Sequence, residues 1–199
     1  MPISFNSIPA DLRTPGTYIE FDSSKAVSGL PPAPNKVLLI GQRLAAGTVP
    51  ELVPARIVTA DQAVEAFGRG SMLAAMARAF KAADPVTECW AIALDDADAG
   101  VAAAKMLTLS GPATGAGTLA LMVAGVRVPV GVASGDSAAT VATAITAAIG
   151  AKPDLPVTAS ADDEVVTLTA RNAGTAGGAI DARVNYFQGE RLPAGISVA

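Results

Sequence analysis

The sequence contains no histidine and only one cysteine among its 199 residues. Without histidine, a Ser–His–Asp triad or a Cys–His pair is excluded. One cysteine alone cannot supply the ligands of a zinc site or form a disulfide within the chain, which suits a reducing compartment. That cysteine, Cys89, lies in the apolar run of residues 86–94, where a buried, unreactive thiol is expected.

Basic residues are also scarce, with 14 Lys and Arg against 18 Asp and Glu and a net charge of −4. They are scattered, whereas binding to nucleic-acid phosphates needs a basic cluster, so we expect no nucleic-acid partner. No apolar run reaches the roughly 18–20 residues that span a bilayer, and the first residues lack the pattern of a signal peptide. We therefore expect no membrane partner and a protein that is cytosolic when it is made.

Three loops have some of the residues of known ligand-binding motifs but lack the rest. The acidic loop Asp95–Asp98 could begin a calcium loop, but its twelfth position, counted from Asp96, is Leu107 instead of a bidentate glutamate. Residues 111–117 contain no Lys followed by Ser or Thr, and residues 41–47 do not fit the dinucleotide-binding pattern. We interpret the acidic loop as a solvated turn and predict no catalytic, cofactor-binding or metal-binding residues. The chain is therefore not expected to be an enzyme.

The first 35 residues contain six prolines, which forbid a long helix there. Between Pro15 and Pro31 one short segment has the alternation of a strand, with Ile19 and Phe21 on one face. No turn joins it to a neighbouring strand, so its backbone can pair within its own domain or with a sheet of another subunit. We predict that it is a partner-binding arm strand, formed by Thr17, Tyr18, Ile19, Glu20, Phe21 and Asp22.

Residues 36–100 predict a strand, two helices and a second strand. The first strand covers residues 36–41, and a brief extended piece covers 56–58. Thr59 and Gln62 have the spacing of a capping box for a helix that ends at Gly68. A second helix is predicted from Ser71 to Ala83, with Met72, Met76 and Phe80 as an apolar stripe and Leu73 and Ala77 beside it. A strand over residues 86–94 is apolar on both faces, which favours a central position covered on both sides.

The residue pattern changes after Gly100, where short predicted strands follow one another and are separated by glycine-rich turns. Strands are predicted at residues 105–110, 118–124, 126–132, 157–160, 164–170 and 181–187. One amphipathic helix, Ser137–Ile149, carries an apolar stripe of Val141, Ile145 and Ile149. Residues 196–198 have the pattern of a strand that begins near the end of the sequence.

Together these patterns predict a mixed fold of the α+β and α/β classes. We expect four parts: an extended N-terminal arm and linker (residues 1–35), a partial α/β core domain (36–100), a β-rich inserted module with one helix (101–188), and a return strand toward a missing C-terminal part (189–199). Because hydrophobic residues make up 51% of the chain and aromatics only 4%, alanine and glycine must let these elements pack closely.

Several segments resemble tail sheath proteins of Mu-like contractile phages. The opening residues Ile3–Pro9 and Arg13–Glu20, with their Pro-Gly-x-Tyr-Ile-Glu stretch, are similar to the start of that family, as is the strand Val37–Gly41. Residues Gly135–Ala142 and Val165–Ala170 resemble a domain that is often inserted in sheath proteins. Sheath proteins are much longer than this chain, so the resemblance implies the N-terminal portion of one.

The resemblance implies a structural subunit of a contractile tail sheath in the virion tail, assembled in the host bacterial cytoplasm. Neighbouring sheath subunits would be its partners in rings stacked around the tail tube. Arms would donate strands to neighbouring subunits, and contraction would drive the tube into the host envelope. Residues 24–35 would then act as the hinge that absorbs the motion. Contacts with the tube and the baseplate would come through the missing C-terminal part.

Two other classes of function stay open at this stage. Strands rich in Thr and Ala after Gly100 would suit another phage structural or surface-binding module of an adhesin-like kind, without catalytic activity. A small α/β enzyme built on residues 36–100 would need a pocket with converging polar groups near Gly41 and Asp95.

Overall fold

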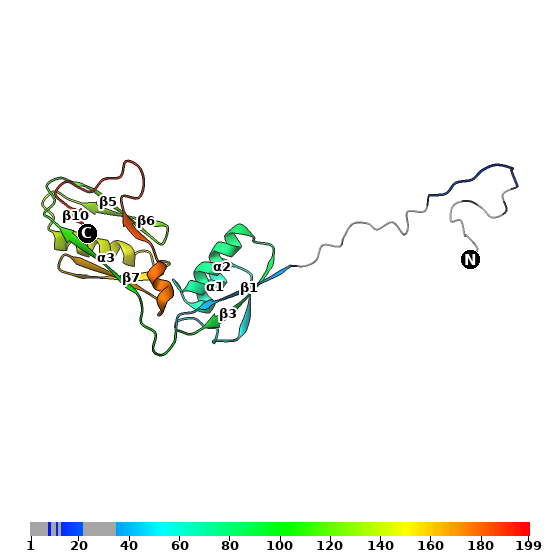
Figure 1. The fold of residues 1–199 in the computed structure, drawn as a ribbon, viewed down its shortest axis with the longest axis horizontal. Coiled ribbons are helices and arrows are strands. Elements are labelled where there is room, and N and C mark those ends of the chain that lie inside the picture. Colours follow the sequence, from blue (N-terminus) through cyan, green and yellow to red (C-terminus); the bar gives the residue numbers. More distant parts are fainter. Residues whose placement is uncertain (1–7, 9–10, 12, 22–34) are drawn as a thin grey trace. The chain divides into compact units, whose positions relative to one another are not determined.

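The structure is a computed structural model that describes residue 8, residue 11, residues 13–21 and residues 35–199. The chain divides into two compact units, residues 1–34 and residues 35–199. All helices and strands of the described residues lie in the second unit (Figure 1). These are β1 (Lys36–Gln42), β2 (Pro54–Ile57), α1 (Ala60–Phe67), α2 (Met72–Ala83), β3 (Glu88–Leu94), β4 (Ala104–Ser110), β5 (Gly117–Val123), β6 (Val126–Val132), α3 (Ala138–Gly150), β7 (Val157–Asp162), β8 (Val165–Ala170), a 3-10 turn (Thr175–Ala179), β9 (Ala182–Val184) and β10 (Ser197–Val198).

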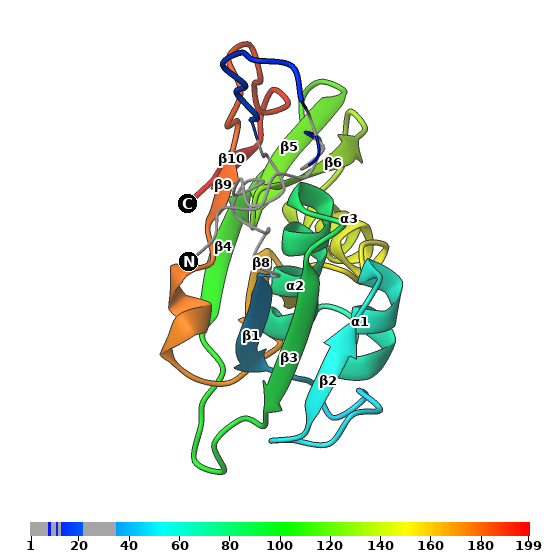
Figure 2. The same ribbon diagram turned by 90° about the vertical axis from the view of Figure 1, so that its right-hand side faces the viewer.

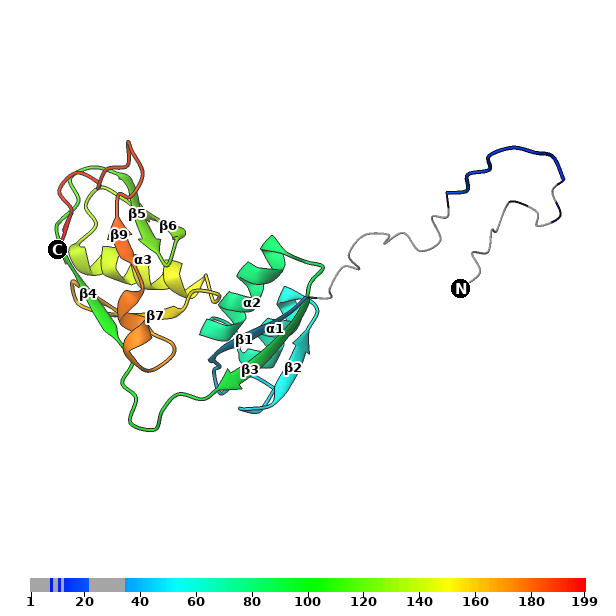
Figure 3. The same cartoon turned by 45° about the vertical axis from the view of Figure 1, so that its right-hand side comes forward.

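Residues 36–94, here called the α/β half, form a three-stranded sheet in the order β1-β3-β2. β1 and β3 run parallel with Leu38 opposite Trp90, and β2 pairs antiparallel with the other edge of β3. Helices α1 and α2 connect β2 to β3 and lie on the same side of the sheet (Figure 3). The predicted succession of strand, helices and parallel strand is confirmed.

Both helices of this half begin at the predicted caps. The Thr59 side chain accepts a hydrogen bond from the backbone of Gln62 at 3.2 Å, and the Gln62 side chain accepts one from Val58 at 2.9 Å. Helix α1 ends at Gly68, whose φ of 86° suits glycine. The Ser71 hydroxyl accepts from the backbone of Ala74 at the start of α2. Local side-chain chemistry therefore fixes where each helix starts.

The predicted apolar side of α2 is confirmed in part. Leu73 and Ala77 are buried as expected, together with Ala74, and they share one hydrophobic cluster with Phe67 of α1 and the small side chains Cys89, Ala91 and Ala93 of β3. The predicted central stripe is wrong, because Met76 is 36% exposed and Met72 and Phe80 are only partly buried. Small side chains let α2 approach the sheet closely, and this approach turns the larger methionines toward the edge of the contact.

Residues 104–198, here called the β-rich half, contain two antiparallel sheets with the orders β10-β4-β8-β7 and β6-β5-β9. Helix α3 lies between strands of the two sheets (Figure 1) and buries the predicted stripe of Val141, Ile145 and Ile149. One hydrophobic cluster joins α3 to both sheets. The predicted strands are all present in this half, although β9 is three residues long and the prediction for it spanned 181–187.

Within the described residues, β3 is covered on one face and not on the two that the sequence predicted. β3 is central in its sheet, but only Cys89, Ala91 and Ala93 face the helices and are buried, whereas Leu94 on the opposite face is 36% exposed. Both helices that could cover the sheet lie on one side, so within the described residues the second side has no helical layer. The described part of the chain also contains no helix long and apolar enough to cross a membrane.

Candidate interaction surfaces

The predicted arm strand is described from Thr17 to Phe21, whereas Asp22 lies outside the described residues. Ile19 is 73% exposed and Phe21 is 92% exposed. Residues 17–21 are not assigned to a strand. The Tyr18 hydroxyl donates a hydrogen bond to the Thr14 carbonyl at 2.7 Å. Strand donation by this segment therefore stays a prediction. The predicted hinge at residues 24–35 falls outside the described residues except for residue 35.

The second surface is the uncovered side of the α/β sheet, here called the open face. Its registers place apolar side chains side by side across three strands. Leu38 and Ile40 of β1 are each 52% exposed, and Trp90 and Ile92 are partly buried beside them. The face as a whole consists of Leu38, Ile40, Pro54, Trp90, Ile92 and Leu94. Figure 2 shows the three strands of this sheet side by side. A contiguous apolar patch of this kind typically marks an interface.

One end of the open face is charged. Glu88 accepts ion pairs from Lys36 at 3.3 Å and from Arg56 at 3.9 Å. Its carboxylate also accepts a hydrogen bond from the indole Nε1 of Trp90 at 2.9 Å. The hydrogen bond from Trp90, followed by the one from Lys36, holds the pKa of Glu88 below its ordinary value. Trp90 is thus oriented by a charge at the edge, and its ring contributes to the apolar centre of the face.

A third feature is the contact between the α/β half and the β-rich half. Asn172 follows β8, is only 8% exposed, and inserts its carboxamide among three segments of the α/β half. Its Nδ2 donates to the Arg43 carbonyl at 2.9 Å and to Asp96 Oδ1 at 3.2 Å. Its Oδ1 accepts from the backbone N–H of Met72, the first residue of α2, at 3.0 Å. Every polar atom of this side chain is therefore paired across the contact.

Asp96 is the second centre of the same contact. Its Oδ1 accepts from Gln42 Nε2 at 2.7 Å, and its Oδ2 accepts from the backbone N–H of Ala173 at 2.7 Å. Gln42 Nε2 also donates to the Ala173 carbonyl at 2.8 Å. We refer to Gln42, Asp96, Asn172 and Ala173 together as the junction network. Sequence analysis missed it, because Asn172 precedes Ala173 and Gly174 and has the pattern of an ordinary turn.

The acidic loop is not the solvated turn that the sequence suggested. Asp96 belongs to the junction network, and the neighbouring Asp95 binds the Arg43 guanidinium through two hydrogen bonds, of which the Nη2–Oδ2 bond is 3.0 Å. The hydrogen bond from Arg43 lowers the pKa of Asp95. Among the described residues, no group of three or more His, Cys, Asp or Glu side chains is placed to hold a metal ion.

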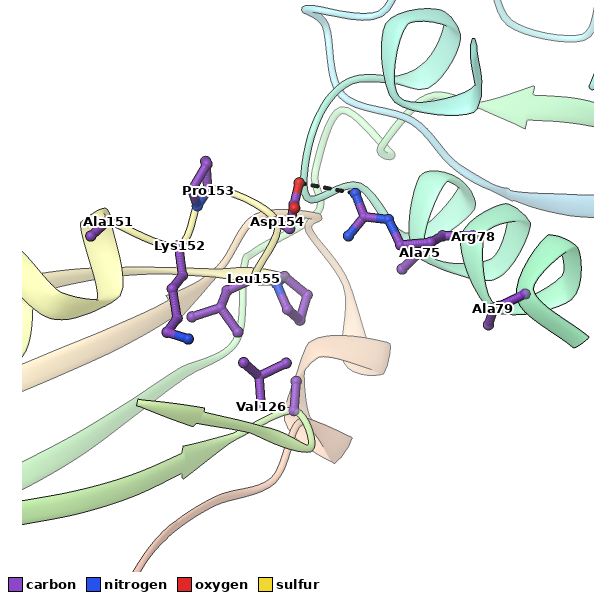
Figure 4. Close-up of a pocket in the computed structure, with 12 residues that line it drawn as sticks. Ala75, Arg78, Ala79, Val126, Ala151, Lys152, Pro153, Asp154 and Leu155 are labelled. Atoms are coloured by element: carbon purple, nitrogen blue, oxygen red, sulfur yellow. Dashed lines mark ion pairs between the residues drawn. The ribbon is translucent and has the colours of Figure 1, made fainter. Parts of the chain in front are cut away.

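On another side of the contact between the halves lies a cleft of about 670 Å³ (Figure 4). Ala75 and Ala79 of α2 line one wall, and Val126 and residues 151–156 line the other. Asp154 bridges the cleft through ion pairs to Arg78 at 3.0 Å and Arg69 at 3.5 Å. The hydrogen bond from Arg78 lowers the pKa of Asp154. All three charged side chains are about half exposed, so these pairs contribute little to stability.

Cys89 is fully buried, as the sequence predicted, and burial raises the pKa of its thiol. A thiol with a raised pKa is a poor nucleophile.

Comparison with known proteins gives two findings. Residues 98–197 match the phage tail sheath protein beta-sandwich domain family. The chain is also 45% identical over 196 residues to the Mu-like prophage FluMu tail sheath protein of Haemophilus influenzae. That alignment covers 98% of this chain and 40% of the relative, so the chain spans about two-fifths of the length of the relative that it matches.

Proposed function

The chain belongs to the phage tail sheath protein family, and we propose on this premise that it is part of a subunit that polymerises into a contractile sheath around the tail tube. The family is one of structural proteins of the virion tail, which agrees with the expectation that the chain is not an enzyme. Its partners are neighbouring copies of the same subunit in rings or a helical stack. Contacts with the tube and the baseplate belong to parts of a sheath subunit outside this sequence.

The arm strand is the proposed link between subunits. The single observation that carries this role is the exposure of Ile19 and Phe21, two apolar side chains that would share one face of the predicted strand. Burial of both against the sheet of a neighbour removes this apolar surface from water. The main-chain ladder gives affinity that does not depend on side-chain identity, and this suits a link that has to hold while the subunits rotate during contraction.

We also propose that residues 36–100 are a partial α/β core domain, distinct from the inserted module at 101–188, with residues 189–199 leading back toward the rest of the core. The open face supports this division, because a sheet with a parallel pair is normally covered on both sides. The occupant that we assign to it is an apolar helical segment from the three-fifths of a sheath subunit that have no counterpart in this sequence. The charged end at Glu88 would set the orientation of that segment.

A proline scan of the arm in a complete sheath subunit tests the proposed link. Proline removes one backbone N–H, and successive N–H groups of a strand point to opposite sides. If the arm pairs along one edge, Ile19→Pro and Phe21→Pro will abolish sheath formation while Tyr18→Pro and Glu20→Pro are tolerated, or the reverse. Deletion of residues 1–23 should leave a folded subunit that no longer polymerises.

One side-chain variant serves as a control, because it leaves both the backbone N–H groups and the apolar side chains of Ile19 and Phe21 unchanged. Tyr18→Phe removes only the hydroxyl that donates to Thr14, and sheaths should still form at normal length under the electron microscope. If rings join normally after deletion of residues 1–23, or if the four proline variants all polymerise, then strand donation by the arm is wrong.

A further inference from the structure

Hydrogen bonds between the α/β half and the β-rich half oppose any change in their relative orientation, and we call this arrangement the lock. Within residues 35–199 the chain passes from the α/β half to the β-rich half once, through residues 95–103. A single connection of this length would by itself allow the halves to reorient. The junction network opposes this, because it ties the end of β1 (Gln42) and the start of α2 (Met72) to the segment after β8, and Asp96 at the start of the connection is bonded to both sides.

Burial makes the network strong where the cleft pairs are weak. Asn172 is nine-tenths buried and all of its donors and acceptors are paired. Breaking the contact would leave the carbonyl of Arg43, the N–H of Met72 and both backbone groups of Ala173 without these partners. A buried polar group without a hydrogen-bond partner costs free energy. The network includes a carboxylate that accepts from two amides and one backbone N–H, and such charge-assisted hydrogen bonds are stronger than neutral ones.

Close backbone packing lies beside the network. Gly70 has a φ of 82°, and a Cβ at this position would lie 2.8 Å from both Arg171 Cδ and the Leu155 carbonyl oxygen of the β-rich half. The Arg171 guanidinium donates to that same carbonyl at 2.9 Å. Gly70 therefore packs directly against the Arg171 side chain and the Leu155 carbonyl, and a side chain at this position would clash with both.

We propose that Asp96 and Asn172 lock the α/β half and the β-rich half into one rigid body, so that a rotation applied to either half is transmitted to the other. The ion pairs of Asp154 across the cleft are secondary to this lock. In a contracting sheath, a neighbour that pulls on the β-rich half would then move β1 with it, and β1 directly follows the proposed hinge. The lock itself is a property of this chain alone and does not depend on polymerisation.

Distance measurements between spin labels across the cleft test the lock in the 199-residue protein. Ala79→Cys in α2 and Ala151→Cys after α3 place exposed labels on opposite walls of the cleft (Figure 4). Cys89 is fully buried and leaves labelling to the introduced cysteines. The unmodified junction should give one narrow distance distribution. Asp96→Asn and Asn172→Ala should each broaden it at least twofold.

Thermal unfolding supplies an independent measurement. With the lock intact, the two halves should unfold in one transition, and Asn172→Ala should split it into two. Circular dichroism at low temperature establishes that each variant is folded before its distances are compared. A network that is merely a local turn would lower the midpoint without broadening the distances or splitting the transition, and that result would overturn the proposal.

Two variants serve as matched controls. Asp98→Asn makes the same chemical change as Asp96→Asn in the same loop, but Asp98 is exposed and has no hydrogen bond or ion pair among the described residues. Arg78→Gln removes the shortest ion pair of the cleft. Both should keep the narrow distribution. Broadening by Arg78→Gln equal to that by Asp96→Asn, or a broad distribution in the unmodified protein, would also overturn the proposal.

Discussion

Replacing Ile40 with threonine should cost little in the 199-residue chain and much more in a complete sheath subunit. Ile40 is 52% exposed on the open face, so about half of the roughly 1.5–3 kcal/mol that full burial of an isoleucine contributes is realised in this chain. Threonine is also β-branched, so the change leaves the strand preference of the backbone almost unaltered. We therefore expect a loss of about 1 kcal/mol in the free energy of unfolding of the 199-residue chain.

In a complete subunit the covered open face would raise this loss to at least about 2 kcal/mol, because the whole side chain loses its apolar contacts and a hydroxyl is buried. Urea unfolding of both proteins, with and without the substitution, gives the two free energies. Circular dichroism follows the transition in both, and in the shorter chain the only tryptophan, Trp90, lies on the open face and gives a second signal.

Leu73→Ala is the matched control, because Leu73 is already fully buried in this chain, on the side of the sheet that α2 covers. Its loss should be about 2–5 kcal/mol and the same in both. If Ile40→Thr costs the same small amount in the complete subunit while Leu73→Ala behaves as expected, then the open face stays exposed there. The proposal that it is covered by the rest of the core would then be refuted.

Three further results are expected from the 199-residue chain. Hydrogen bonds from Arg43 and Trp90 lower the pKa values of Asp95 and Glu88 respectively. The contribution of these two carboxylates to stability is therefore complete above the ordinary carboxyl pKa near 4 and is lost as the pH falls below it. A urea midpoint that stays constant from pH 5 to pH 3 would contradict this. Phe67→Ala should cost about 3–5 kcal/mol, because Phe67 is fully buried in the core of the α/β half; a loss below about 1 kcal/mol in urea unfolding would show that this core is not well packed. Cys89 should react with a thiol reagent only upon unfolding, because it is fully buried, and rapid labelling of the folded protein at neutral pH would show that β3 opens.

Much of the fold follows from local patterns in the sequence. The helix starts at Thr59 and Ser71 are readable because their side chains satisfy the first backbone N–H groups. The stripe of α3 is readable because a helix with one apolar face has one possible orientation toward its core. Alternation in β8, with Val166 and Leu168 buried, gives the inward face of that strand.

The two predictions that the structure corrects concern β3 and α2, and in both the question is which face of an apolar element packs against the core. Trp90 and Ile92 have the same hydrophobicity whether a partner covers them or not, so the sequence of β3 could not show that the open face is uncovered here. In α2, either Leu73 and Ala77 or the methionines could face the core. The small residues of β3 favour burial of Leu73 and Ala77, and this packing cannot be read from the sequence of the helix alone.

The junction network was unpredictable for a different reason. Gln42 and Asn172 are 130 residues apart in sequence, and neither residue type is unusual at the end of a strand. Their roles arise only when β1, β3 and β8 end at the same place in the fold. The arm strand, in contrast, could be proposed from sequence because its pattern is local, and the proposal that a neighbouring subunit accepts it stays a prediction.

The thin layer between α2 and the sheet makes the spacing of the whole subunit sensitive to single atoms. A methyl group added at Gly41 would lie 3.2 Å from Met76 Sδ and 3.5 Å from Leu73, so alanine fits once the flexible Met76 side chain shifts by a few tenths of an ångström, whereas a larger side chain would push α2 away from the sheet. Because the first residue of α2 is bonded to Asn172, a helix pushed outward would also tilt the β-rich half. In a stack of many identical rings such a tilt would be repeated at every level, and a displacement too small to unfold one molecule would accumulate into a change of helical pitch.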